Sequence, residues 1–572
     1  MNSRAVLDAE TGSAPAVAPE PHVPAAIRRR GFVESWLDAW LDVIALTMVA
    51  AGFVIRVVVA ARSFWNPDEA LHYSLIHQPS VLLAYKASLT NAHPPLLFMV
   101  VYFWQFLGRS ELMLRMPSVL AGTASCWIAF KWVSKLFGRA AGAISVVLVT
   151  FSPCMIALSA ELREYAVLLF CIGCALYFLA EAFEQNSARK VWFFSLFLYL
   201  AILTHYSAAL LVAAAGVYAL ARIASAQPSR KFIAAWTAGQ AGALALYAFL
   251  YVTHVSKLKS IRTVWESTFE HSMFHRQDGS LLAFTGNNTV KIFEFLFENK
   301  YTSFGMLFVF LAGIAVLLAR DTIRRRADSP SRHAGLLLLL PFAAVWGAAV
   351  ANIYPYSGTR HTVLLAPFMI AAVSFALAAA FGRKLAAGLL IAALLSVASN
   401  TSGLTFEPYI KKENQRRELM SAAVIYMKGA IPRSDLIVTD FQSSPLLSYY
   451  LCGPGPMVGG LIRGEHFDIS CGGYRMVSSA TWKFLVENFE PDFQEMAEQY
   501  RLAPGQRVWI FQTGWGSNLD TELPWFVPKF RCLTSQSFGQ NITVIPFVVG
   551  PDRLPALPPG SPHLSSLGLC VK

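Results

Sequence analysis

The feature that most constrains this chain is a series of long apolar runs separated by short basic turns. A membrane-spanning helix needs about 20 predominantly apolar residues, and several runs approach or exceed that length. The eleven runs lie near residues 40–61, 115–134, 140–158, 165–183, 191–204, 206–223, 232–252, 303–320, 335–352, 361–381 and 384–399. Charged residues make up 14% of the 572 residues, which is too few to cover a water-soluble protein, where usage is about 25%. The sequence therefore predicts an α-helical polytopic membrane protein with about 11 transmembrane helices.

Basic residues gather in the turns after every second run, which fixes an orientation. If the N-terminus is cytoplasmic, all these turns are cytoplasmic, as the positive-inside rule requires. The residues concerned are Lys131, Lys135, Arg139, Arg189, Lys190, Arg222, Arg230, Lys231, Arg320, Arg324, Arg325, Arg326, Arg332, Arg383 and Lys384. The net charge of +12 then reflects membrane anchoring, and we do not expect a nucleic-acid partner. We expect a multi-pass membrane protein with membrane lipids around it and a cytoplasmic N-terminus.

Two segments decide this orientation. Residues 93–108 are apolar but short and open with two prolines, so we interpret them as an interfacial helix rather than a span. Residues 191–223 are better described as two short spans that meet at Thr204, His205 and Tyr206. Such a turn lies at membrane depth, where only a cavity tolerates polar backbone. The long segments 62–114 and 253–302 become outer loops.

Three parts follow from this pattern. Residues 1–36 are rich in Ala, Pro and Glu and are expected to form a disordered cytoplasmic N-terminus. Residues 37–399 form the transmembrane domain. Residues 400–572 have ordinary composition and predict a periplasmic α/β domain.

Short segments of this last part predict its elements. A helix should end before Pro432, strands should cover 435–440 and 507–513, and a helix should begin in SSPLLSYYL. Because an extracytoplasmic compartment is oxidising, one or two disulfides are expected among four cysteines. These are Cys452, Cys471, Cys532 and Cys570.

The first outer loop, 62–114, carries the segment SFWNPDEALHY with the adjacent carboxylates Asp68 and Glu69. A partly desolvated carboxylate at a membrane surface suits a general base. The alternative is a solvated loop acid or a helix cap. Further along this loop, His93 precedes two prolines, and it is either a site residue or a solvated turn residue. Arg115 then either extends its charge to the surface or binds an anion.

Further ionisable residues stand at the outer ends of later runs. Glu161, Arg163, Glu164 and Tyr165 crowd one short turn, either as an ion-paired helix start or as part of a cavity facing Asp68. His205 lies in the buried turn and is a functional candidate by its depth, with a satisfied neutral histidine as the alternative.

Arg360 and His361 begin the tenth run, and a guanidinium suits phosphate. Ionisable residues thus avoid the middle of the runs and gather at one face, which predicts an anionic, lipid-borne substrate. The common nucleotide, hydrolase and zinc motifs are missing from any credible setting. No metal-ligand set or required cofactor is evident. A divalent cation that bridges Asp68 or Glu69 and the substrate phosphate remains an alternative.

The ordered series NPDEALHY, AHPPLL, GRSELMLRMPS, KLFGRAAG, SPCMIALSAELREYAVLL and SGTRHTVLLAPF resembles the GT-C glycosyltransferases. The similarity covers residues 40–400, and the bacterial dolichyl-phosphate-mannose–protein mannosyltransferase-like and RgtA/B/C/D-like proteins are the nearest branch. The resemblance implies a membrane enzyme that takes a sugar from a polyprenyl-phosphate donor. It transfers the sugar, usually with inversion, to a lipid, glycan or protein outside the cytoplasm.

The resemblance also implies roles for individual residues. Asp68 corresponds to the acidic base, with Glu69 beside it, and Arg115 to the arginine after the interfacial helix. The polar turn corresponds to Glu161, Arg163 and Tyr165. Arg360 corresponds to the arginine near the donor phosphate, although His361 stands where tyrosine is common. The alternatives are a transporter or flippase for lipid-linked saccharides, which places substrate near the midplane, a polymerase or ligase of such saccharides, and a scaffold without activity.

Overall fold

The computed structural model describes residues 32–258, 269–323, 331–382, 384–401, 415–453, 465–503, 505–515, 530–532, 535–539 and 542–549. Most of the expected disordered segment 1–36 and Cys570 lie outside the described residues. The first helix, α1 (Phe32–Arg62), starts inside that segment and earlier than the apolar run at 40–61. The correction arises because a helix extends past its apolar centre into amphipathic sequence, which hydropathy alone does not detect.

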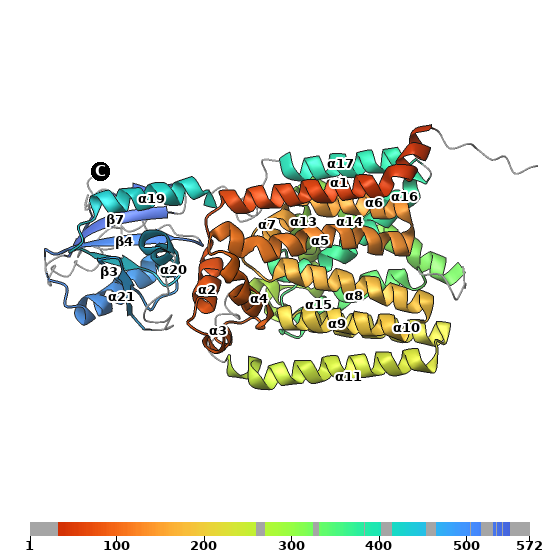
Figure 1. Ribbon diagram of the computed structural model, residues 1–572, viewed down its shortest axis with the longest axis horizontal. Coiled ribbons are helices and arrows are strands. Elements are labelled where there is room, and N and C mark those ends of the chain that lie inside the picture. Colours follow the sequence, from red (N-terminus) through yellow and green to blue (C-terminus); the bar gives the residue numbers. More distant parts are fainter. Residues whose placement is uncertain are drawn as a thin grey trace, which may run out of the picture.

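Long apolar helices lie side by side along the long axis of the molecule (Figure 1). Each apolar run of the sequence after the first corresponds to one helix or to two consecutive helices. They are α5 (Glu111–Phe137), α6 (Arg139–Phe151), α7 (Pro153–Ser159), α8 (Tyr165–Gln185), α9 (Ala188–Thr204), α10 (Ala208–Ala226), α11 (Arg230–Thr253), α14 (Lys300–Ile323), α15 (Ala334–Val350), η5 (Arg360–Leu365) with α16 (Ala366–Phe381), and α17 (Leu385–Thr401).

Seven of the described helices are long and apolar enough to cross a membrane, or eight if the bent pair α6 and α7 counts as one span. The protein is thus a multi-pass α-helical membrane protein, as the sequence predicts. The number eleven stays a prediction.

A side chain of the first span donates hydrogen bonds to the backbone at the bend between α6 and α7. The two helices meet at an angle of 60°, and Pro153, which lacks an N–H, cannot bond the carbonyl of Val149. The guanidinium of Arg56 donates from Nη2 to that oxygen at 3.5 Å and from Nη1 to Thr150 O at 3.3 Å. Arg56 is fully buried within α1. The helix break thus supplies backbone acceptors that satisfy a buried cation near the end of the first span.

Short helices cover one end of the bundle. They are α2 (Pro67–Ile76), α3 (Val81–Ser88), α4 (Leu96–Trp104) and the 3-10 turn η1 (Gln105–Leu107). The helix expected over 93–108 is present as α4 and η1, and it exposes Phe103, Phe106 and Leu107. An exposed aromatic and aliphatic edge of this kind supports an interfacial position.

The expected loop 253–302 is not a simple loop. It contains the turns η2 (Val255–Lys257), η3 (Glu270–Ser272) and η4 (Arg276–Asp278) and the helix α13 (Leu281–Phe297). This helix buries Ile292, Phe293 and Phe297 and packs on α14 and α7. Hydropathy missed it because polar residues such as Asn287 and Lys291 interrupt the apolar ones.

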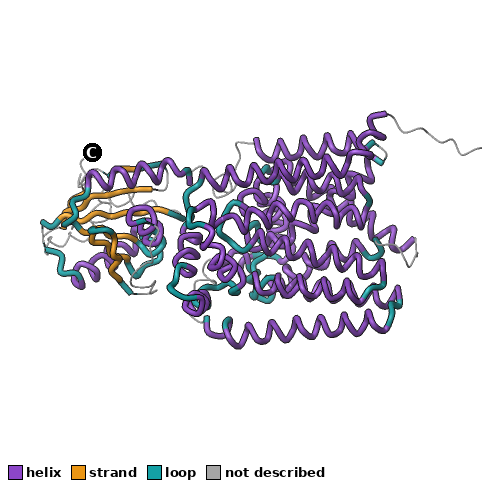
Figure 2. Tube along the Cα trace, in the orientation of Figure 1, coloured by secondary structure: helices purple, strands orange, loops and turns teal. Residues whose placement is uncertain are grey.

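The C-terminal part combines helices with a sheet, whose strands lie at the end of the molecule near α2 (Figures 1 and 2). Its helices and strands are α19 (Arg417–Ala430), β1 (Leu436–Thr439), α20 (Ser444–Leu447) with the π-helical turn η7 (Ser448–Cys452), β2 (Phe467–Cys471), β3 (Tyr474–Ser478), α21 (Val486–Gln499), β4 (Arg507–Thr513), β5 (Phe530–Cys532), β6 (Gln536–Ser537) and β7 (Ile542–Val549).

The sheet order is β2-β3-β1-β4-β7-β5, with β6 paired to β7. β1 is parallel to both β3 and β4. The helices and strands expected at these places are confirmed, and so is the expectation of a disulfide, which joins Cys452 to Cys471.

The sheet-containing part and the first loop of the membrane part share one hydrophobic core. The backbone N–H of Phe64 donates to Gln415 O at 2.7 Å, and that of Trp65 donates to Tyr450 Oη at 2.9 Å. The ring of Trp65 is fully buried, with its centroid 4.1 Å from that of Tyr449. The loop that carries the acidic motif is therefore packed directly against the sheet-containing part.

Candidate functional site

Helix α2 begins with a capping box that presents the acidic pair. The side chain of Asn66 accepts from the N–H of Glu69 at 2.9 Å, and Glu69 Oε2 accepts from the N–H of Asn66 at 3.0 Å. Pro67 follows at the first helical position, where its missing N–H costs nothing. Consecutive helical residues point about 100° apart, so Asp68 and Glu69 face different surroundings.

Glu69 belongs to a buried ion pair with Arg115. Arg115 donates from Nε to Glu69 Oε1 at 2.7 Å and from Nη2 to Oε2 at 2.8 Å, and both side chains are fully buried. Arg115 also donates to the carbonyls of Ala60, Ser63 and Phe64 at the end of α1. This arrangement clamps α2 to α1 and α5 through a pair that is closed off from solvent. The roles of Glu69 and Arg115 in the reaction stay predictions.

Asp68 faces away from that pair, toward two guanidinium groups. Its Oδ2 lies 2.6 Å from Arg360 Nη2 and 3.6 Å from Arg163 Nη1. Burial alone would raise the pKa of Asp68, but the charges of Arg360, Arg163 and His72 outweigh it and hold the pKa well below the usual range. The side chains of Asp68 and Arg360 keep 14% and 25% exposure, so a ligand can reach this pair.

Glu164 joins several of the remaining groups. Its carboxylate lies 3.3 Å from His72 Nε2, 3.1 Å from His93 Nε2 and 3.3 Å from Arg163 Nη2. His72 Nδ1 in turn lies 2.7 Å from the backbone oxygen of Asp68. Burial would raise the pKa of Glu164, but Arg163 and the histidines hold it well below the usual range.

Sequence reasoning named Glu164 without singling it out and missed His72. The signal was present, since His72 stands four residues after Asp68 and so shares its helix face.

His205, His361 and Tyr165 bring aromatic rings to the same cluster. The ring centroid of His205 lies 5.1 Å from that of His93, 5.6 Å from Tyr165 and 6.2 Å from His361. Burial lowers the pKa of His205 to about 4, so it is neutral at neutral pH, and its Nδ1 accepts from Ser207 N at 3.1 Å. Of the residues singled out from sequence, Asp68, His93, Arg163, Tyr165, His205, Arg360 and His361 thus belong to one connected cluster. Glu161 is fully buried in the turn beside it.

Three ligand atoms could in principle hold a metal ion. Those of His93, Glu164 and His205 lie within 4.8 Å of one another. However, Arg163 Nη2 lies 3.3 Å from both His93 Nε2 and Glu164 Oε1, so a guanidinium already stands beside two of the three. His205 uses Nδ1 as an acceptor, which leaves the proton on Nε2. The set as arranged does not fit a cation, and we derive no step through one.

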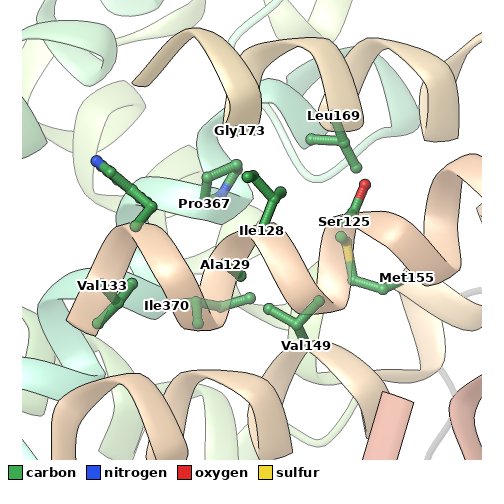
Figure 3. A pocket seen from close by; sticks show the side chains of 11 residues that line it. Ser125, Ile128, Ala129, Val133, Val149, Met155, Leu169, Gly173, Pro367 and Ile370 are labelled. Carbon is green, nitrogen blue, oxygen red and sulfur yellow. The ribbon is translucent and has the colours of Figure 1, made fainter. Parts of the chain in front are cut away.

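A separate apolar cavity of about 30 Å³ lies within the bundle (Figure 3). Ser125, Met155, Leu169 and Pro367 are among its lining residues, and they come from α5, α7, α8 and α16. No residue of the polar cluster lines it, so it is separate from the candidate site.

The structure and the sequence were compared with known proteins. The chain is similar over residues 92–252, less than half of its length, to the dolichyl-phosphate-mannose-protein mannosyltransferase family. ArnT from Cupriavidus metallidurans in the apo state has a TM-score of 0.52 at 14% identity, and the match covers 89% of this chain and 98% of that one.

ArnT bound to undecaprenyl phosphate gives a TM-score of 0.51 at 13% identity, with 88% and 97% covered. AglB from Archaeoglobus fulgidus, in complex with an inhibitory peptide and a dolichol-phosphate, matches at a TM-score of 0.46 and 12% identity, over 83% and 70%. No curated protein matches the chain in sequence.

The family similarity and the two ArnT structures identify the class of fold. The chain has the fold of the GT-C superfamily of membrane glycosyltransferases, and the resemblance stated from its motifs is confirmed. Within that class, the bacterial ArnT structures match almost over their full length.

Proposed function

We propose that the chain is a membrane glycosyltransferase that moves a sugar from a polyprenyl-phosphate donor to an extracytoplasmic acceptor. The acceptor is a lipid, a glycan or a protein. The observation that carries the proposal is the partly exposed pair of Asp68 and Arg360, 2.6 Å apart at one end of a membrane bundle. The transfer needs a base for the acceptor hydroxyl and a cation for the leaving phosphate, and this pair supplies one group of each kind. The undecaprenyl phosphate bound by ArnT supports a lipid phosphate as the ligand.

Asp68 is the general base of the proposed reaction. The acceptor hydroxyl loses its proton to the carboxylate while its oxygen attacks the anomeric carbon of the donor. The bond from that carbon to the phosphate oxygen breaks, and the phosphate leaves with the electron pair as polyprenyl phosphate. One displacement inverts the anomeric centre. A positioned base contributes about 10²- to 10⁴-fold to such a rate.

The arginines stabilise the charge that grows on the leaving phosphate. Arg360 is the most accessible of them and can donate two parallel hydrogen bonds. Arg163 lies next to it, held by Glu164 at 3.3 Å. Preorganised cations in a site poor in water stabilise a developing anion more than they would in water.

The charge distribution supports an extracytoplasmic position for this site. Lys135, Arg139 and Lys190 lie at the helix ends opposite the site, where they pair with Glu181 and Asp42. A basic end of a bundle faces the cytoplasm. We therefore assign the protein to the bacterial inner membrane, with the sheet-containing part on the periplasmic side.

Mutation of the base tests the proposal. Asp68→Asn should reduce transfer from purified polyprenyl-phosphate sugar at least ~10²-fold while membrane insertion and protein level persist. Asp42→Asn is the matched control, because Asp42 is exposed and its pair with Arg139 contributes little. Mass spectrometry of envelope lipids and glycans shows whether one sugar or a preassembled block is added. Normal turnover by the Asp68→Asn enzyme would show that the assignment is wrong.

A further inference from the structure

The sheet-containing part contributes one aromatic side chain to the polar cluster. Strand β4 ends at Thr513, and Trp515 follows two residues later. The guanidinium carbon Cζ of Arg360 lies 6.0 Å from the centroid of the Trp515 ring. The same Cζ lies 6.0 Å from the centroid of Tyr165. The proposed phosphate ligand therefore contacts one aromatic ring from each part of the protein.

Trp515 is held in this place by its neighbours. Its backbone N–H donates to Gln442 Oε1 at 3.3 Å, and Gln442 follows β1, the strand next to β4. Gly514 has a φ of +106°, and a Cβ there would lie 2.6 Å from Pro67 Cγ. Only glycine fits both demands. The turn after β4 is thus packed against the residue that directly precedes Asp68.

The position of Trp515 relates it to the reacting atoms. In the proposed reaction the donor phosphate binds Arg360 and the acceptor hydroxyl binds Asp68, and the sugar lies next to both residues. Trp515 is half-buried and lies beside Arg360, so it adjoins the place where a sugar ring must sit. One face of a pyranose ring presents mainly C–H groups. These groups can pack on the electron-rich face of an indole, as other apolar and weakly positive groups do.

We infer that Trp515 is a sugar-binding residue, a platform on which a pyranose ring stacks at the catalytic site. This inference rests on the proposed function and goes beyond it, because it gives the sheet-containing part a direct share in substrate recognition. The pyranose comes either from the donor or from a glycan acceptor. A role of Trp515 in positioning Arg360 alone is the competing explanation.

Binding of two kinds of lipid, undecaprenyl phosphate without a sugar and its glycosylated derivatives, distinguishes these cases. Purified full-length protein is titrated with undecaprenyl phosphate and with its mannosyl, glucosyl and galactosyl derivatives. For a donor sugar on Trp515, Trp515→Ala weakens binding of at least one glycosylated lipid roughly tenfold and leaves undecaprenyl phosphate unchanged. Trp515→Phe retains most of the binding. Trp482→Ala is the matched control, since Trp482 lies in the same part and is 38% exposed.

An acceptor glycan gives a different pattern. Both lipids then bind Trp515→Ala normally, while the KM for acceptor in an envelope extract from cells lacking the gene rises roughly tenfold. Equal weakening of both lipids, or no change in any of these measurements, overturns the inference. If the wild-type protein binds neither lipid and transfers no sugar, the proposed function fails and the inference falls with it. Thermal unfolding of each variant checks that the protein is folded.

Discussion

Asp68 Oδ2 and Arg360 Nη2 lie 2.6 Å apart, although one residue belongs to α2 and the other to the turn before α16. The pair joins the proposed base to the proposed phosphate ligand. A phosphate that binds Arg360 competes with the carboxylate for the same guanidinium. If the proposed function holds, we expect donor binding to raise the pKa of Asp68, so that the carboxylate becomes an effective base only when there is a sugar to transfer.

Replacing Arg360 should therefore change the pH dependence of transfer. Arg360 lowers the pKa of Asp68, and a carboxylate base is active above its pKa. In Arg360→Ala the pKa of Asp68 rises, so the acidic limb of kcat/KM moves to higher pH by about 1 to 2 units, and the donor KM rises. Profiles of kcat/KM against pH check this. Arg189→Ala, at the far end of the bundle, should leave the limb in place, and an unmoved limb in Arg360→Ala would contradict the coupling.

Breaking the buried pair of Glu69 and Arg115 should affect stability before chemistry. Glu69→Gln leaves the guanidinium of Arg115 buried without its countercharge, which costs about 3 to 5 kcal/mol. Thermal unfolding in detergent should show a clear loss of Tm relative to the wild type and to Asp42→Asn. A Glu69→Gln protein with normal Tm and no transfer would instead give Glu69 a role in the reaction itself.

Neutral His205 should make stability fall in mild acid. Its pKa is lowered to about 4 in the folded protein, whereas the unfolded value is about 6.5. Between these values the unfolded chain binds more protons, so the free energy of unfolding decreases as the pH falls, by up to about 3 kcal/mol. His205→Asn keeps an acceptor for Ser207 N–H but cannot bind the proton. Its Tm should decrease less than that of the wild type between about pH 7 and pH 5, and parallel curves would exclude this contribution.

Alanine variants of two glycines can distinguish the cost of backbone strain from the cost of a packing clash between the sheet-containing part and the first outer loop. Gly514 and Gly505 both have positive φ, +106° and +83°, but a Cβ at Gly505 would meet nothing within 4 Å. Gly505→Ala should therefore cost only about 1 kcal/mol of strain. Gly514→Ala adds a clash with Pro67 and should also lower transfer, because Pro67 precedes the base. Tm and kcat of the two variants are compared, and equal effects on both would remove the packing argument.

The membrane bundle could be predicted from the sequence because hydropathy is a local property. Each apolar run corresponds to helix, and the short strand at 435–440 was recognisable as a fully buried run. Helix α13 was not recognised, because polar residues interrupt its apolar ones along the sequence. Its buried face, with Ile292 and Phe293, is recognisable only from its packing on α14 and α7. Arg56 was missed for a related reason, because its acceptors belong to a helix break about ninety residues away.

The sequence predicted which charged residues belong to the candidate site, but not which of them form ion pairs with one another. The sequence places Asp68, Arg163 and Arg360 at one face, and the structure brings them together. The sequence could not show that Glu69 and Arg115 form a separate ion pair. Adjacent carboxylates are equivalent in a sequence pattern, and only the helix geometry directs Asp68 and Glu69 to different surroundings. Trp515 carries no local signal, since its relation to Arg360 depends on how the sheet docks.

The common core of Trp65, Tyr449 and Tyr450 has a consequence for biosynthesis. The surroundings of Trp65 are completed by residues that leave the ribosome nearly four hundred positions later. The loop with the acidic motif therefore acquires its final shape only after Tyr449 and Tyr450 have been synthesised. A nascent chain released early would carry all the reactive groups of the bundle and still lack a finished catalytic centre.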